Sequence, residues 1–208
     1  MHPRPRVHLV ILNAMQQVLH VHGGEAFETR GQYLTWLREF SLDDPTVEQP
    51  KRWSRRLTED LGPEFQVIAP YMPSKRYATY EEWSIWFEKY VPYLKDGCVF
   101  VGNSLGANFL AKYLAEHELP ISVKALHLVA GCFGAPQGFS LDETPLERLC
   151  KTIPTITIYH SSDDTFVPLK DAEKYAAALP CAEFVLLQNR GHFLQEEFPE
   201  LLERLRQS

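Results

Sequence analysis

Six short apolar runs alternate with longer stretches of helical spacing, and this alternation limits the fold more than any other feature of the chain. The apolar runs cover residues 17–22, 65–69, 98–102, 123–130, 155–159 and 183–187. Helical spacing is found at residues 33–40, 52–61, 80–94, 105–116, 146–151, 171–179 and 198–207. Runs that are apolar throughout are typical of strands covered on both faces, and helical crossovers make a sheet parallel. The sequence therefore predicts an α/β fold of about six mainly parallel strands with helices on both faces.

Length and composition favour one domain. The chain has 208 residues, of which 45% are hydrophobic, and this is enough for a single sizeable core. We assign residues 15–208 to this domain and interpret residues 1–14, which precede a second plausible start at Met15, as an amino-terminal extension. The connection of residues 131–154 is too short for a separate cap domain, so no large cap is expected.

Charge and cysteine content narrow the partners and the compartment. The net charge is −6 and the 21 Lys and Arg residues are dispersed, which argues against nucleic acid and against an anionic membrane surface. No apolar run reaches the roughly 18 to 20 residues that span a bilayer. The four cysteines lie far apart without C-x-x-C spacing, so we interpret them as reduced thiols of a cytoplasmic protein without a metal site. They are Cys98, Cys132, Cys150 and Cys181.

The stretch FVGNSLGANF, residues 100–109, places one serine between two glycines where an apolar run meets a helical stretch. In a nucleophile elbow, a sharp strand-to-helix turn strains the backbone of the nucleophile and crowds the positions two residues before and after it. Gly102 and Gly106 meet that demand because they have no side chain. The turn would expose the Ser104 hydroxyl and aim the N–H groups at the helix start, including that of Leu105, at developing negative charge.

A serine nucleophile needs a base, and the base needs an acid that orients it. Asp163 and Asp164 follow the fifth apolar run in the segment YHSSDDTFVP, and His192 follows the sixth in NRGHF. The carboxyl ends of parallel strands meet at one edge of a sheet, so these side chains are expected near Ser104. Serine, aspartate and histidine in this order complete a candidate catalytic triad.

With these motifs the chain resembles the α/β-hydrolase superfamily, and within it the small serine hydrolases akin to retinoblastoma-binding protein 9 and related bacterial hydrolases. The resemblance extends from about residue 17 to the end of the chain and implies the strand order 2-1-3-4-5-6. In that family the first strand often ends in a His-Gly-X motif, whose last residue supplies an oxyanion N–H. The motif here is His22-Gly23-Gly24, so the resemblance gives that role to Gly24, with Leu105 as its partner.

The resemblance also separates the two aspartates. The superfamily pattern G-x-x-D-x-x-V-P falls on Ser161 to Pro168 and selects Asp164 as the acid, with His192 as the base. Two positions depart from the family. Asn103 stands where histidine is commonest in the elbow, and Ser161 replaces the usual glycine. Neither change removes a catalytic group, but both leave the subfamily and the substrate open.

Aromatic and apolar residues after the second strand and in the later connection are candidates for a substrate pocket. They are Tyr71, Met72, Tyr77, Phe133 and Phe139. Trp83 and Phe87 are four residues apart in a helical stretch, and we predict that they pack against the sheet.

Together these observations predict a serine hydrolase of the carboxylesterase type. It would cleave a carboxylic ester or related acyl bond of a small molecule through an acyl-enzyme, without a cofactor. Acyl length, the choice among ester, thioester and amide, any protein partner and the oligomeric state stay undetermined. Two alternatives are open. His20 and His22 share one face of a strand, as in some metal-dependent hydrolases, although further ligands are not evident. A hydrolase fold can also serve as a non-catalytic binding or interaction protein.

Overall fold

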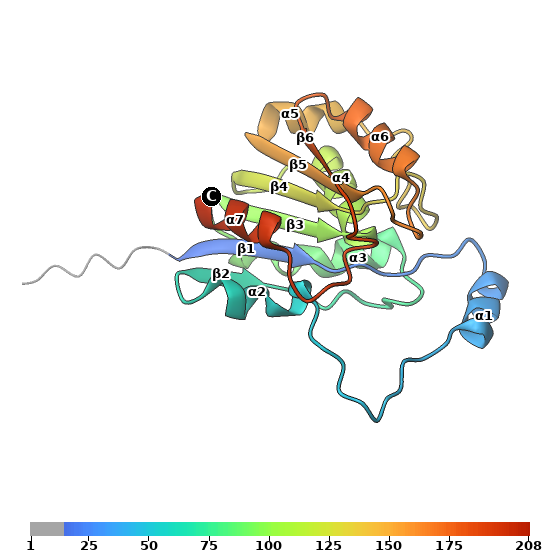
Figure 1. Ribbon diagram of the computed structural model, residues 1–208. Helices are drawn as coiled ribbons and strands as arrows, with labels where there is room; N and C mark the ends of the chain where they lie inside the picture. The colour runs from blue at the N-terminus through green and yellow to red at the C-terminus, as the bar shows by residue number, and fades with distance from the viewer. Residues whose placement is uncertain (1–14) are drawn as a thin grey trace, which may run out of the picture.

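The protein folds around a six-stranded parallel sheet with the order β2-β1-β3-β4-β5-β6, which confirms the predicted topology (Figure 1). The computed structural model describes residues 15–208, so the predicted extension at residues 1–14 lies outside the described residues. The strands are β1 (Gln16–Val21), β2 (Phe65–Ile68), β3 (Cys98–Asn103), β4 (Val123–Val129), β5 (Thr155–Ser161) and β6 (Glu183–Leu187).

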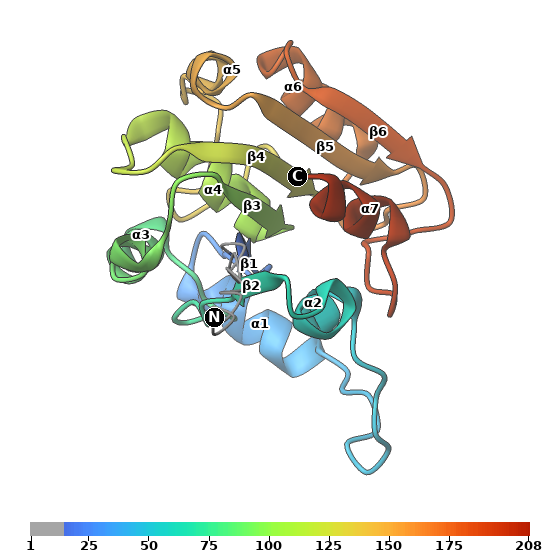
Figure 2. The ribbon, with the colours of Figure 1, turned by 90° about the vertical axis from the view of Figure 1, so that its left-hand side faces the viewer.

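Helices cover both faces of this sheet. They are α1 (Arg30–Glu39), α2 (Trp53–Leu61), α3 (Tyr80–Glu88), α4 (Leu105–Glu116), α5 (Leu149–Thr152), α6 (Leu169–Ala178) and α7 (Pro199–Gln207), with the 3₁₀ helices η1 (Val91–Tyr93) and η2 (Leu146–Arg148). Helices α2 and α7 pack on one face, and α3, α4, α5 and α6 pack on the other (Figure 2). Among the helices of residues 15–208, none is long and apolar enough to cross a membrane.

Each central strand contributes to two hydrophobic cores, because successive side chains of a strand point to opposite faces. In β3, Phe100 belongs to the core beneath α3 and α4, whereas Val99 and Val101 belong to the core beneath α2 and α7. Burial on both faces explains why the strands are apolar throughout. Trp83 and Phe87 are fully buried in the first of these cores, as predicted.

Most element boundaries differ from the sequence prediction by a few residues, and two of the differences have a clear physical reason. The spacing at residues 80–94 predicts one helix, but α3 ends at Glu88 and η1 follows. Pro92 explains the break, because proline lacks the N–H that a continuing α-helix would donate to the carbonyl of Glu88. Strand β5 ends at Ser161 rather than at residue 159. Its last residues are polar yet buried, since the ring of His160 donates from Nε2 to the carbonyl of Val167 at 3.1 Å.

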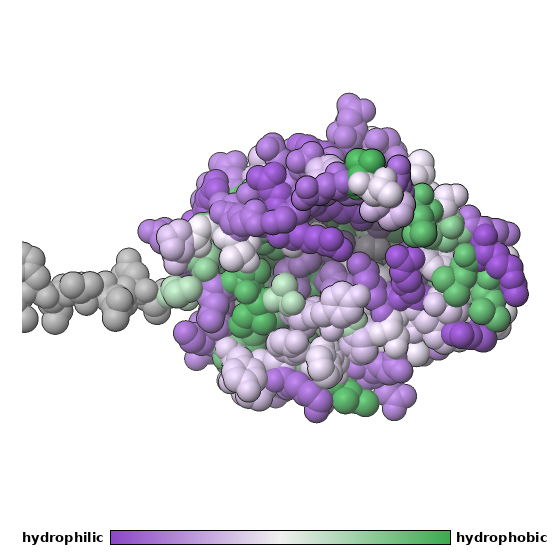
Figure 3. Space-filling view, turned by 90° about the horizontal axis from the view of Figure 1, so that it is seen from below, coloured by the Kyte–Doolittle hydropathy of each residue, from purple (hydrophilic) through white to green (hydrophobic). Residues whose placement is uncertain are grey.

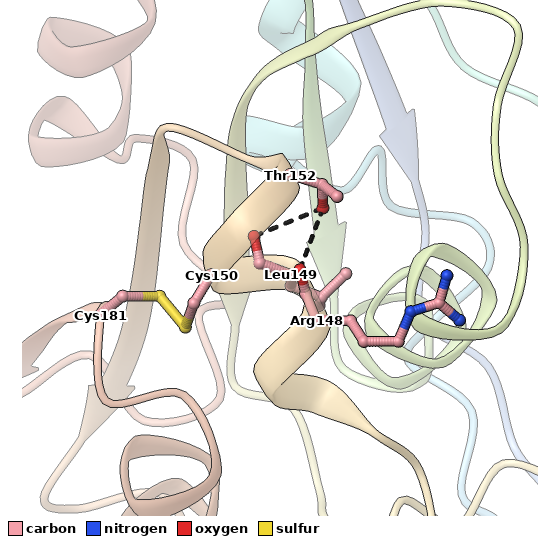
Figure 4. Close-up of a disulfide and its surroundings, with 5 residues drawn as sticks. All are labelled: Arg148, Leu149, Cys150, Thr152 and Cys181. Atoms are coloured by element: carbon pink, nitrogen blue, oxygen red, sulfur yellow. Dashed lines mark hydrogen bonds between the residues drawn. A yellow bond between two sulfur atoms is a disulfide. The ribbon is translucent and has the colours of Figure 1, made fainter.

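The prediction of four reduced thiols is wrong for two of the cysteines. Cys150 in α5 and Cys181 in the turn before β6 form a disulfide, with Cα atoms 5.7 Å apart (Figure 4). The partners are 31 residues apart and meet only through the fold, so no local pattern indicates the pair. Cys98 and Cys132 are free, and burial raises their pKa values to about 12 and about 11. The cytoplasmic location therefore loses part of its support and stays a prediction.

Within the connection between β1 and β2, the segment from α1 to residue 52 has no buried side chain. Helix α1 begins after Thr29, whose side chain accepts a hydrogen bond from the N–H of Gln32 at 3.2 Å. No side chain of α1 is buried, and residues 40–52 after it are exposed. Figure 1 shows α1 standing apart from the sheet. By contrast, the connection between β4 and β5 carries only η2 and α5.

Candidate active site

Ser104 lies at the junction of β3 and α4 in a backbone conformation that residues with a side chain seldom adopt. Its φ is 52° and its ψ is −127°, outside the regions that hard-sphere contacts allow for such residues. Its N–H donates to the carbonyl of Val129 at 2.7 Å, and its carbonyl accepts from the N–H of Ala107 at 2.9 Å. Hydrogen bonds to β4 and within α4 therefore hold one strained residue at the carboxyl edge of the sheet.

The two elbow glycines are required by close backbone packing. A Cβ atom at Gly102 would lie 2.5 Å from the carbonyl oxygen of Gly106. A Cβ atom at Gly106 would lie 2.2 Å from the carbonyl oxygen of Val21 and 2.6 Å from that of His22. Backbone atoms cannot turn aside as the end of a flexible side chain can. Gly102 thus lets the end of β3 lie against the first turn of α4, and Gly106 lets that turn lie directly against the end of β1.

His192 joins Ser104 to Asp164 through both nitrogens of its ring. Its Nε2 lies 3.0 Å from the Oγ of Ser104, and its Nδ1 lies 2.8 Å from the Oδ2 of Asp164. The side chain of Asp164 has no exposed surface, and 12% of the His192 side chain is exposed. These groups follow β3, β5 and β6, so the carboxyl ends of three parallel strands bring them to one place.

The Asp164 carboxylate is held in its ionised form. Its Oδ1 accepts hydrogen bonds from the N–H groups of Phe166 at 2.8 Å and Val167 at 3.0 Å. Burial alone would raise the pKa of Asp164, but the hydrogen bond from His192 and those from the backbone outweigh it and lower the pKa. The negative charge favours a proton on Nδ1 of His192, which leaves Nε2 free to accept the proton of the Ser104 hydroxyl.

Asp163 makes a different set of contacts from its neighbour. Its Oδ1 accepts a hydrogen bond from the N–H of Gly191 at 3.2 Å and another from the Ser161 hydroxyl. The same hydroxyl oxygen accepts from the N–H of Arg190 at 3.1 Å. Asp163 therefore fastens the loop that carries the candidate base to the end of β5, and its hydrogen bonds do not include the imidazole.

The segment after β1 packs against the elbow. A Cβ atom at Gly23 would lie only 2.9 Å from the Cβ of Ser104, so Gly24 follows directly beside the candidate nucleophile. Leu105 is the first residue of α4, and its N–H has no acceptor within the helix. Within residues 15–208, neither the N–H of Gly24 nor that of Leu105 donates to a protein acceptor. Both donors are thus free to bind an oxyanion.

His20 and His22 make hydrogen bonds that oppose their use as metal ligands. His20 is buried with its Nε2 2.9 Å from the Oδ1 of Asn103, and burial lowers its pKa to about 4. His22 donates from Nδ1 to the carbonyl of Gly23 at 2.7 Å and accepts at Nε2 from the N–H of Met72 at 2.9 Å. His22 thereby shapes the segment beside the nucleophile. In the described part of the chain, no three His, Cys, Asp or Glu side chains are grouped to hold a metal ion.

The predicted pocket residues do not share one environment. Met72 and Phe139 have no exposed surface and pack in the core beneath α3 and α4, so the prediction that they line a pocket is wrong. Phe133 is 8% exposed and belongs to the same core. These positions lie in irregular segments, where no periodicity tells a buried side chain from an exposed one.

The other two predicted pocket residues lie near the surface. Tyr71 is 74% exposed, and its ring centre lies 5.5 Å from that of His22, beside the candidate oxyanion segment. Tyr77 is half-buried, and its ring centre lies 4.9 Å from that of Tyr33 in α1. These two residues stay candidates for contact with a substrate.

A cavity of about 630 Å³ lies on the outer side of the loop that carries His192. It is lined by parts of the segments 43–52 and 190–197, including Arg52 and Arg190, and it does not reach Ser104. Figure 3 shows a hollow on the lower face of the molecule, with hydrophilic side chains around it and hydrophobic side chains on the side where α1 lies.

One residue that holds the histidine loop is not among the sequence-based candidates. The backbone N–H of Trp53 donates to the carbonyl of Gln195 at 3.0 Å, and its indole N–H donates to the carbonyl of Phe193 at 2.8 Å. The apolar spacing of α2 marks Trp53 as a core residue, which it is, with 2% exposure. Its bonds reach 140 residues along the chain, so no local signal could have revealed them.

The fold is similar to that of other solved structures. The structure is similar to the ydeN gene product of B. subtilis, with a TM-score of 0.68, 20% identity, and coverage of 92% of this chain and 97% of that chain. It is also similar to Est1E from Butyrivibrio proteoclasticus, with a TM-score of 0.55, 12% identity, and coverage of 94% and 87%. Such identities show the fold alone.

The amino-acid sequence is also similar to that of known serine hydrolases. The chain is 28% identical over 157 residues to the serine hydrolase RBBP9 of Rattus norvegicus, which covers 72% of this chain and 81% of the relative. Residues 46–205, which include Ser104, Asp164 and His192, match the serine hydrolase family. The match extends over more than half of the chain. This protein therefore belongs to the serine hydrolase family.

Proposed function

We propose that this protein cleaves a carboxylic ester or related acyl bond of a small molecule, with Ser104, His192 and Asp164 as its catalytic triad. The observation that carries the proposal is the unbroken series of hydrogen bonds from Ser104 Oγ to His192 Nε2 at 3.0 Å and from His192 Nδ1 to Asp164 Oδ2 at 2.8 Å. Such a series activates a hydroxyl group that is otherwise a poor nucleophile at neutral pH.

The reaction begins when Ser104 Oγ attacks the acyl carbon and its proton passes to Nε2 of His192. The electron pair of the carbonyl bond moves onto its oxygen, where the N–H groups of Gly24 and Leu105 bind it. The intermediate collapses, the bond to the leaving group breaks, and His192 protonates that group. Asp164 stays ionised throughout and stabilises the imidazolium.

Water completes the cycle. His192 removes a proton from the water molecule as its oxygen attacks the acyl-enzyme, and the same oxyanion donors bind the second tetrahedral intermediate. The bond to Ser104 then breaks, His192 returns the proton to Oγ, and the carboxylic acid leaves.

The alternative is a non-catalytic binding protein on the same fold. Backbone strain at Ser104 favours the enzyme, because a φ of 52° at a non-glycine residue costs on the order of 1–3 kcal/mol of stability. A binding surface has no use for that strain, whereas a nucleophile at the turn needs it to project its hydroxyl. The free N–H groups of Gly24 and Leu105 favour the same choice.

A small substrate fits the surroundings of the triad. The side chains of Ser104 and His192 keep part of their surface exposed to solvent. The β4–β5 connection carries only η2 and α5. A substrate can therefore reach the nucleophile directly from solvent.

Labelling with a fluorophosphonate tests whether Ser104 is activated, because the adduct resembles the tetrahedral intermediate. We expect intact-mass analysis to find one adduct per chain, none with Ser104→Ala, and much slower labelling with His192→Ala. Ser162→Ala removes an exposed serine close to the site and should label like the wild type. Circular dichroism should show that all variants are folded.

A panel of short- and long-chain aryl esters completes the test. We expect turnover by the wild-type protein and none by Ser104→Ala above the uncatalysed rate. If the folded wild-type protein takes up no probe and hydrolyses no ester, the binding-protein alternative replaces this proposal.

A further inference from the structure

A turn at residues 73–77 packs against the segment that carries Gly24. The N–H of Glu25 donates to the carbonyl of Lys75 at 2.8 Å, and the carbonyl of Glu25 accepts from the N–H of Ala78, just after the turn, also at 2.8 Å. A Cβ atom at Gly24 would lie 2.8 Å from the carbonyl oxygen of Lys75. The side chains of Lys75 and Arg76 therefore begin from backbone that is fixed beside the oxyanion donors.

The first turn of α2 is fixed to the other side of the site. The backbone N–H and the indole N–H of Trp53 bind the carbonyls of Gln195 and Phe193, in the loop that carries the candidate base. Arg52 immediately precedes Trp53, and Arg55 lies two residues after it. Both arginines are exposed. Their side chains thus begin from backbone anchored beside that loop.

Lys75 is within reach of the positive charges of both anchored segments. Lys75 is half-buried, and its pKa is lowered first by burial and then by repulsion from the guanidinium groups of Arg55, Arg52 and Arg76. The positive charge also reaches the oxyanion segment. Burial is the main cause of the lowered pKa of His22, and the charges of Lys75 and Arg55 lower it further.

Acidic side chains lie near this group of cations but form no ion pair with them in the described part of the chain. Elsewhere on the surface, arginines pair with acids, as Arg204 does with Glu183. None of the four cations forms an ion pair within residues 15–208. Glu25 attracts Lys75 and Arg76 without forming an ion pair with either. Arg52 lines the cavity of about 630 Å³ with Asp43, Glu196 and Glu197 but is not paired with any of them. The four cations are thus left without a direct partner in a chain whose net charge is −6, an arrangement that a bound anion would stabilise.

The guanidinium group of Arg76 is held in place by aromatic rings instead of by an acid. It lies 5.7 Å from the ring centre of Trp36 and 5.0 Å from that of Phe40. Cation–π contacts of this kind position a cation without neutralising its charge. Its N–H donors are then available for two parallel hydrogen bonds to a carboxylate or a phosphate.

We propose that Lys75, Arg76, Arg52 and Arg55 form a subsite for a carboxylate or phosphate group of the substrate. This assignment rests on the proposed esterase function and names its substrate class. Because the subsite adjoins the oxyanion segment, the anionic group belongs to the same molecule as the scissile acyl bond. The competing assignment is a cationic substrate bound by Glu25, and the experiment includes it.

Three p-nitrophenyl esters of similar length compare the charge types. They are the glutarate half-ester, which is anionic, the valerate, which is neutral, and the 4-(trimethylammonio)butyrate, which is cationic. At low ionic strength we expect kcat/KM for the anionic ester to exceed that for the neutral ester by about tenfold or more, a factor equivalent to about 1.4 kcal/mol. The preference should shrink at high salt, because salt screens charge–charge attraction.

Equilibrium binding provides a readout that does not depend on turnover. Isothermal titration at low salt with glutarate and, separately, with inorganic phosphate shows which anion binds. The double variant Lys75→Met, Arg76→Met should lose this binding and bring the ratio of anionic to neutral kcat/KM towards one. The matched control Lys89→Met, Lys124→Met removes the same charge from exposed positions outside the subsite and should keep both the binding and the ratio.

The outcomes separate this inference from the proposed function. If the neutral ester is hydrolysed but neither anion binds, or if the subsite variant and the control behave alike, the subsite is refuted and the esterase stands. A preference for the cationic ester would refute the subsite and assign recognition to Glu25. If glutarate or phosphate binds as expected but Ser104 is neither labelled nor able to hydrolyse an ester, the anion site stands and the esterase falls.

Discussion

Replacing Asp164 with asparagine keeps the shape of the side chain and changes what each terminal atom can do. In the native protein, Oδ1 accepts two N–H groups, from Phe166 and Val167, and Oδ2 accepts the Nδ1 proton of His192. Asparagine has a single oxygen. If the amide group faced the two backbone donors, both would lose their acceptor, and for the N–H of the buried Val167 this loss would cost about 1–3 kcal/mol. We therefore expect the oxygen to keep these donors and the amide group to face His192.

This orientation puts the imidazole in the wrong tautomer. An amide N–H beside Nδ1 needs an acceptor, so the ring proton moves to Nε2, the nitrogen that must accept the proton of Ser104. In a serine protease the same exchange lowers kcat by ~10⁴. At ~1.36 kcal/mol per tenfold, that loss is about 5.5 kcal/mol of activation free energy, and we expect a similar value here.

The assay compares kcat for a p-nitrophenyl ester and the rate of fluorophosphonate labelling in Asp164→Asn and Asp163→Asn. Asp163 binds the N–H of Gly191 and the Ser161 hydroxyl but not the ring, so Asp163→Asn should keep at least about a tenth of the turnover, a loss below ~1.4 kcal/mol. Melting curves should show both variants folded. Equal or reversed losses would refute this argument and reassign the orienting acid.

Two further predictions concern stability. Gly106→Ala drives a methyl group into the carbonyl of Val21, 2.2 Å away, and should lower the free energy of unfolding in urea by about 3 kcal/mol or more, whereas Gly31→Ala, with no atom nearer than 3.7 Å, should change it by less than about 1 kcal/mol. Equal effects would contradict the packing argument. Burial lowers the pKa of His127 from 6.5 to about 4, so protonation favours the unfolded chain and stability should fall as the pH drops from 6.5 to 4. His127→Gln should remove about 3 kcal/mol of that loss, and an unchanged pH dependence in urea unfolding would show that the ring is not held neutral.

The layered fold was predictable because its signals are local. Each central strand is buried on both faces, so its residues are apolar throughout, and the six runs correspond to the six strands. The elbow motif is also local in sequence, although the contacts that require its glycines form only in the folded protein. Gly102 is needed because the end of β3 lies against the first turn of α4, and Gly106 because α4 lies against the end of β1; these contacts leave a pattern of only five residues.

Tertiary contacts that no sequence motif marks were not predictable. Cys150 and Cys181 pair because the fold brings α5 next to the turn that precedes β6, and no sequence pattern near either residue indicates the pair. Tyr71 and Met72 are neighbours in an irregular segment, yet one is 74% exposed and the other has no exposed surface. Because this segment has no helical or strand periodicity, the sequence does not indicate which of the two side chains is buried and which is exposed.

Helix α1 and the exposed residues 40–52 can be altered without disturbing the hydrophobic cores. No side chain of α1 is buried, so changes here leave the two cores intact, and doubling the length of a flexible loop costs only about 0.6 kcal/mol. This segment is therefore expected to tolerate inserted residues. Because Trp36 and Phe40 hold the guanidinium group of Arg76, the same segment adjoins the proposed recognition surface. The proposed recognition surface and the two folded cores thus lie in separable parts of the chain, and a library confined to residues 36–52 would vary the first while the sheet preserves the second.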